Sequence, residues 1–81
     1  MSFTGMNIAE MAEGQQGRIS AIATDSPELE AKLREIGFCE GDEVQLLSVG
    51  PLGGQPLAVR LNRRVIAMRK NEASAVIVKS D

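Results

Sequence analysis

The chain has 81 residues, a net charge of −2, 43% hydrophobic residues and only 2% aromatic residues. This length and apolar content are those of one small folded domain rather than a disordered chain. The sequence has no histidine and only one cysteine, so it lacks the usual acid–base group of neutral-pH catalysis and cannot form an internal disulfide.

The first expected elements are a short helical turn and a strand. Asn7 is a suitable cap for a turn over residues 8–12, and residues 17–24 read as the first strand. Residues 1–14 contain no basic segment followed by an apolar run, so they do not look like a secretion signal. No apolar stretch approaches the ~20 residues that cross a bilayer. We therefore expect a cytoplasmic protein.

A helix is predicted to start within residues 25–28, because the side chain of either Asp25 or Ser26 can cap the first turn and Pro27 has no N–H to lose there. Its apolar stripe carries Leu29, Leu33 and Ile36 at positions i, i+4 and i+7. Gly37 can adopt the left-handed conformation that ends a helix, and Phe38 would then fold back onto Leu33.

Short strands dominate the rest of the chain. We expect them over residues 43–49, 57–61, 64–69 and 75–78, with a two-residue turn at 62–63 and one helical turn at 71–73. Alternation predicts that Val44, Leu46 and Ser48 share one face of their strand. The result is a mostly β fold, a small SH3-like barrel of about five antiparallel strands with one α-helix inserted after the first strand. The whole chain, 1–81, is expected to be this single domain.

The loop over residues 51–56 is the best candidate for binding a partner, since loops between strands commonly hold partners. Leu52 lies between a proline and two glycines, where no local pattern demands burial, and the glycines allow another backbone to approach closely. The alternative is that Leu52 folds back and plugs the end of the barrel. The candidate loop residues are Pro51, Leu52, Gly53 and Gly54.

A cluster of basic residues is the second candidate for partner binding. Residues 1–50 carry a net charge of −6 and residues 51–81 a net charge of +4, so the chain is acidic first and basic last. Such residues can grip an acidic protein surface, although two solvated charged surfaces would give the same pattern. No aromatic residue interleaves with them and the pI is about 5.1, so nucleic acid is not expected as a partner. The cluster comprises Arg60, Arg63, Arg64, Arg69 and Lys70.

Four residues after the helix form a weak candidate metal site. Cys39, Glu40, Asp42 and Glu43 lie close together in sequence, and a thiolate with carboxylates can hold Fe²⁺ or Zn²⁺. Without an imidazole or a second thiolate, a loop with solvated acids explains the same residues. We therefore expect no resident cofactor and no catalytic residue. A site shared between two chains stays open.

The order of motifs resembles the FeoA family of bacterial ferrous-iron uptake. The resemblance extends over most of residues 33–73 and depends on Leu33, Ile36-Gly37-Phe38, Gly41-Asp42, Val44, Pro51-Leu52-Gly53-Gly54, Pro56, Val59, Ala67-Met68-Arg69 and Glu72-Ala73. It implies an SH3-like fold and a non-catalytic accessory protein that docks on the cytoplasmic part of the FeoB permease. Since small barrels can pair through an edge strand, a monomer or weak dimer is expected.

Two other functions are compatible with the same small barrel. One is a stand-alone metal-sensing or regulatory SH3-like module related to the terminal domain of iron-dependent repressors, although no DNA-binding helix pair is recognisable here. The other is an RNA- or ribosome-associated barrel, which would bind RNA in a salt-sensitive manner.

Overall fold

The computed structural model of the chain describes residues 5–79. This part contains six strands, one helix of three turns and two shorter helical segments. In chain order they are β1 (Gly5–Asn7), the 3₁₀ helix η1 (Ile8–Glu10), β2 (Gln16–Ile22), α1 (Pro27–Ile36), β3 (Glu43–Leu52), β4 (Gln55–Leu61), β5 (Arg64–Met68), α2 (Lys70–Ala73) and β6 (Val76–Lys79). The expected domain, 1–81, extends beyond the described residues at both ends.

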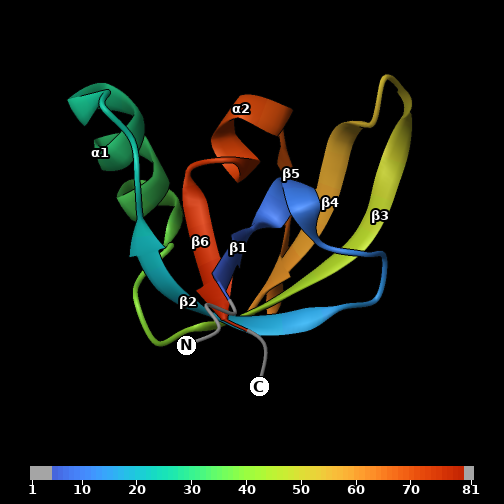
Figure 1. Cartoon of the computed structure of the whole chain (residues 1–81), viewed down its shortest axis with the longest axis horizontal. Coiled ribbons are helices and arrows are strands. Elements are labelled where there is room, and N and C mark those ends of the chain that lie inside the picture. The colour runs from blue at the N-terminus through green and yellow to red at the C-terminus, as the bar shows by residue number, and fades with distance from the viewer. Residues whose placement is uncertain (1–4, 80–81) are drawn as a thin grey trace.

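The strands form one antiparallel sheet in the order β1-β6-β2-β3-β4-β5. The sheet curls around its core, while α1 and the tip of the β3–β4 hairpin rise on opposite sides of α2 (Figure 1). The expected fold class is confirmed, with one addition. A three-residue strand, β1, precedes the others and pairs with β6, so the helix follows the second strand. Within residues 5–79, β1 and β5 are the two ends of the sheet, and hydrogen bonds do not join them to each other.

The ends of α1 agree with the sequence prediction. The Ser26 hydroxyl accepts the Leu29 N–H at 3.2 Å, and Pro27 occupies the first helical position. At the other end Gly37 has a φ of +126°, a value that favours glycine. The Phe38 N–H then donates to the Leu33 carbonyl at 3.0 Å, which turns the chain back toward the helix.

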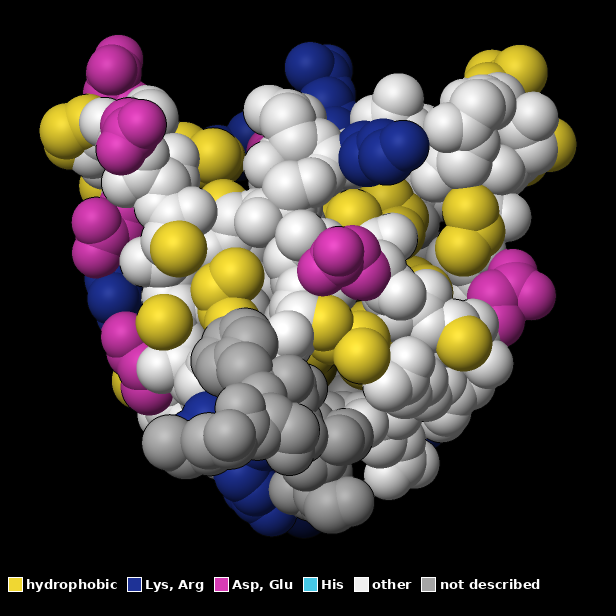
Figure 2. Space-filling model, in the orientation of Figure 1, with side chains coloured by type: hydrophobic (Ala, Val, Ile, Leu, Met, Phe, Trp, Pro, Cys, Tyr) yellow, Lys and Arg dark blue, Asp and Glu magenta, His cyan; other side chains and the backbone are white. Residues whose placement is uncertain are grey.

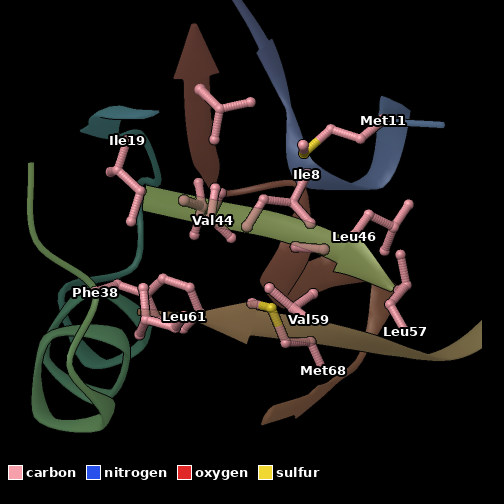
Figure 3. Close-up of a cluster of buried hydrophobic side chains, with 14 of the residues drawn as sticks. Ile8, Met11, Ile19, Phe38, Val44, Leu46, Leu57, Val59, Leu61 and Met68 are labelled. Carbon is pink, nitrogen blue, oxygen red and sulfur yellow. The ribbon is translucent and has the colours of Figure 1, made fainter. Parts of the chain in front are cut away.

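The hydrophobic core lies inside the curl of the sheet (Figure 3). Its largest side chain, Phe38, is 1% exposed. Strand β4 shows the expected alternation, because Leu57, Val59 and Leu61 are all buried. The other large buried side chains come from η1, α1, β2, β3, β5 and β6, and include Ile8, Leu33, Ile19, Leu46, Met68 and Val76.

The alternation predicted for β3 was wrong at Ser48. Val44 and Leu46 are buried as expected, but the pairing with β4 shifts between Leu46 and Ser48. A bulge of this kind adds a residue to one strand and reverses the faces beyond it. Ser48 is therefore opposite Ala58 and exposed.

Candidate partner-docking site

The β3–β4 hairpin carries the largest exposed apolar side chain of the described residues. Strand β3 continues to Leu52, three residues past the predicted end, and the turn at Gly53 and Gly54 uses φ angles of +65° and +81°. Leu52 is 79% exposed, so the alternative in which it plugs the barrel is wrong. Figure 2 shows hydrophobic side chains gathered at the hairpin tip, upper right. The tip thus presents an apolar side chain to solvent, next to the exposed Pro51.

The outer half of this hairpin, near its tip, is held by hydrogen bonds to two other parts of the fold. The Val49 N–H donates to the Glu13 carboxylate at 2.9 Å. The Lys70 N–H, at the start of α2, donates to the Gln55 side-chain oxygen at 2.8 Å. Both strands of the hairpin are therefore anchored close to the turn that carries Leu52.

The structure divides the predicted basic cluster by role. Arg60 is exposed on the outer face of β4, and Arg63 is exposed in the turn between β4 and β5. Arg64 instead turns toward α1 and donates from its guanidinium to the Ile36 carbonyl. A carbonyl at the end of a helix lacks an intrahelical partner, so Arg64 helps to cap α1. Arg69 is exposed and immediately precedes α2, where its backbone N–H donates to Glu72.

The four candidate metal ligands do not converge in the structure. Glu40 accepts two hydrogen bonds from the Arg34 guanidinium, at 3.0 and 3.1 Å, and this pairing lowers the pKa of Glu40 to about 2. The Glu43 carboxylate lies 3.5 Å from the Arg18 guanidinium, and the Cys39 side chain is exposed. Among residues 5–79 no three Cys, Asp or Glu side chains, Asp42 included, lie close enough together to hold a metal ion. These residues do not fit a metal site within one chain.

Sequence reasoning missed a groove between α1 and the β5–α2 segment. It has a volume of about 410 Å³. The Lys32 ammonium and the Glu72 carboxylate meet at its side, 2.6 Å apart, and so connect α1 with α2. The residues that line the groove are Lys32, Ile36, Pro56, Ala67, Met68, Arg69 and Glu72. Only long-range contacts create this groove, so no local pattern could have indicated it.

Glu72 is the one described charged residue that the fold buries, with 8% exposure. Its carboxylate accepts the Arg69 N–H at 2.9 Å and the Lys32 ammonium at 2.6 Å. Both interactions hold the pKa of Glu72 below its ordinary value, and the hydrogen bond from the Arg69 backbone contributes more than the one from Lys32. A carboxyl with a lowered pKa in the folded state stabilises the fold above its unfolded pKa, and this contribution is lost as the pH falls through the folded pKa.

We expect Glu72→Gln to lower the free energy of unfolding at pH 7 by about 1–3 kcal/mol, because a charge-assisted acceptor is replaced by a neutral amide. The loss should shrink as the pH falls below about 4.3, where the wild-type carboxyl gains its proton in the unfolded chain. Urea unfolding at several pH values measures both effects, with Glu28→Gln on the exposed face of α1 as the control. An equal loss at pH 7 and at pH 2 would contradict the assigned role of the charge.

These features define a small SH3-like β barrel with an exposed apolar hairpin tip. The chain belongs to the FeoA family: the model of the FeoA domain matches residues 6–80. It is accordingly a ferrous-iron-transport-associated protein and has the non-catalytic accessory domain of that family.

Solved structures agree with this assignment. The chain is similar to Stenotrophomonas maltophilia FeoA crystallised with zinc, with 30% identity over 91% of this chain and 89% of that one, and a TM-score of 0.80. It is also similar to FeoA from Chlorobium tepidum, with 28% identity over 93% and 70% of the two chains and a TM-score of 0.81. No curated protein is similar enough in sequence to count as a match.

The same fold also occurs within longer chains. IdeR from T. acidophilum is 21% identical, with a TM-score of 0.83, and this chain covers 36% of it. At that identity the likeness concerns the fold alone. Within residues 5–79 no helix has the length and apolar character required to traverse a membrane.

Proposed function

We propose that this chain is an accessory protein of bacterial ferrous-iron uptake that docks on the cytoplasmic part of a FeoB-type permease and supports transport. The observation that carries the proposal is Leu52, 79% exposed at the tip of a hairpin whose two strands are both held by hydrogen bonds near that tip. Membership of the FeoA family supplies the transport context. We expect the protein to act in the cytoplasm, as a monomer or weak dimer.

Leu52 would enter an apolar pocket on the permease. Complete burial of a leucine side chain contributes about 1.5–3 kcal/mol, enough to act as the anchor of an interface. Arg60 and Arg63 lie toward the opposite end of β4 from Leu52 and would contact acidic groups on a separate part of the same permease surface. Such peripheral charges chiefly speed association and set specificity. Arg64 is left out of this surface because its guanidinium holds the end of α1.

We expect Leu52→Asp to weaken binding to the soluble G-protein domain of the permease by at least about tenfold, since burying an unpaired carboxylate is costly. Amide NMR titration of the labelled chain, with and without a GTP analogue, measures this and reports which residues shift. Leu52→Met is the matched control, because it keeps an apolar side chain of similar volume. The site assignment would be overturned by unchanged binding of Leu52→Asp.

A charge-reversed variant, Arg60→Glu with Arg63→Glu, examines the basic part of the surface without disturbing the cap on α1. Slower association that is most pronounced at low salt would support it. Zinc is present in the S. maltophilia relative, whereas the candidate ligands of this chain do not converge. The docking proposal does not depend on metal binding by this chain.

A further inference from the structure

Strand β5 is an edge of the described sheet and has unused backbone groups. A two-residue turn joins Leu61 to Arg64, and such a turn is closed by a hydrogen-bonded pair. Hydrogen-bonded and non-hydrogen-bonded pairs alternate along antiparallel strands, so Val65 and Ala67, opposite Arg60 and Ala58, direct their N–H and C=O groups away from β4. Within residues 5–79 no hydrogen bond to any other part of the fold uses the backbone N–H or C=O group of Val65 or Ala67.

The groove beside α1 runs along this same edge. Ala67 and Met68 face opposite sides of β5, because successive side chains alternate, yet both line the groove. A groove that touches both faces must pass along the strand's edge. Its opposite wall is α1, through Lys32 and Ile36. The volume of about 410 Å³ suits a few residues of extended chain.

The charges around this edge select the occupant. Residues 60–70 contain five basic residues and no acidic one. Glu72, the only acid that lines the groove, is already paired with Lys32 at 2.6 Å. An antiparallel pairing with β5 of a second copy would bring these like charges together, which is destabilising. The edge therefore favours a segment of opposite charge.

We propose that the β5 edge binds an extended acidic peptide segment of a partner protein, which adds a strand to the sheet beside Val65 and Ala67 and places its carboxylates near Arg63 and Arg69. Backbone pairing would give affinity and the basic residues would give selectivity. Val65, 62% exposed on the outer face, would pack against an apolar side chain of the added strand. Arg63 is assigned to both surfaces, but Leu52 does not belong to this edge and Val65 does not belong to the hairpin tip, so Leu52→Asp and Val65→Pro distinguish the two docking modes.

The test is an amide NMR titration of the labelled full chain with a blocked octapeptide of alternating glutamate and valine, and with the same peptide carrying lysine for glutamate. We expect saturable shifts in β5 with the acidic peptide only, and slower hydrogen exchange at the amides of Val65 and Ala67. Absence of binding at millimolar acidic peptide, or shifts that leave β5 untouched, would overturn the proposal.

A proline variant separates strand addition from simple charge attraction. Val65→Pro removes one outward N–H while leaving all charges in place, and proline is tolerated on an edge strand whose N–H faces solvent. We expect Val65→Pro to bind the peptide about tenfold more weakly than Val65→Thr, which also loses the apolar contact of Val65 but keeps the N–H. Amide spectra verify that both variants fold.

Two further outcomes would count against strand addition. Equal affinity of Val65→Pro and Val65→Thr would show that charge alone attracts the peptide. Sedimentation that shows dimers without peptide, with Val65 and Ala67 already protected from exchange, would show that a second copy occupies the edge.

Discussion

Phe38→Ala should lower the free energy of unfolding by about 3–5 kcal/mol, the largest effect we expect from any single change in this chain. Phe38 is 1% exposed and is the largest fully buried side chain. Truncation removes both its transfer free energy and its packing contacts, and a sheet curled around one small core has little freedom to collapse into the cavity. The whole free energy of unfolding of a small domain is about 5–15 kcal/mol, so the variant should be marginally folded.

Urea unfolding followed by circular dichroism measures this loss, with Cys39→Ala as the control on the next, exposed residue. The result should extend beyond stability. Phe38 follows the end of α1 directly, and its buried ring anchors the chain in the core at the point where it leaves the helix. The backbone bond from the Phe38 N–H to the Leu33 carbonyl, 3.0 Å long, can form with alanine too, so the variant isolates the contribution of the ring. Faster hydrogen exchange in α1 than in β3 and β4 is expected in the variant. A loss below about 1 kcal/mol would mean that Phe38 is not the anchor of α1.

The helix and the strands β2 to β6 were predictable because their signals are local. A hydroxyl and a proline mark the start of α1, and a glycine marks its end. The turn between β4 and β5 needs a positive φ at Asn62, which is observed at +55°, and asparagine tolerates that value better than most residues. Each of these requirements is satisfied within a few residues of sequence.

Features that depend on distant pairing were not predictable. Strand β1 has three residues and pairs with β6 more than 65 residues later, so no alternation could reveal it. The bulge in β3 depends on how that strand meets β4, and alternation alone placed Ser48 on the wrong face. In both cases the partner strand decides the local structure.

The same distinction applies to the candidate site. The proline and glycines around Leu52 left both exposure and burial open, and only the fold shows that Leu52 is 79% exposed. The role of Arg64 was not predictable either, because its partner, the Ile36 carbonyl, lies 28 residues earlier and exists only where α1 ends beside β5. Glu40 looked like a metal ligand among neighbouring acids, but its partner Arg34 lies on the preceding helix and accounts for its charge. Sequence proximity grouped residues that the fold separates.

Gly50→Ala should destabilise the protein by about 1–3 kcal/mol and displace the Leu52 tip, because there is no room for a methyl group at this point of the hairpin. A Cβ atom on Gly50 would lie 2.3 Å from the Gln55 carbonyl oxygen and 2.7 Å from the Pro56 nitrogen. Both are backbone atoms, so strands β3 and β4 would have to separate. The hairpin thus requires glycine for close approach and not for its dihedral angle.

Gly41→Ala is the matched control, since its φ is +95° but nothing lies within 4 Å of an added Cβ. Gly41→Ala should lower the free energy of unfolding by about 1 kcal/mol through backbone strain alone. The amide NMR signals of residues 51–56 should stay where they are in the wild type. Gly50→Ala should shift those amides and weaken permease binding in the same direction as Leu52→Asp. Without the steric clash, alanine in a strand would stabilise the chain by about 0.4–1 kcal/mol relative to glycine. An increase in stability would therefore show that β3 and β4 are not as close at Gly50 as the structure places them, and that Leu52 projects from a looser base.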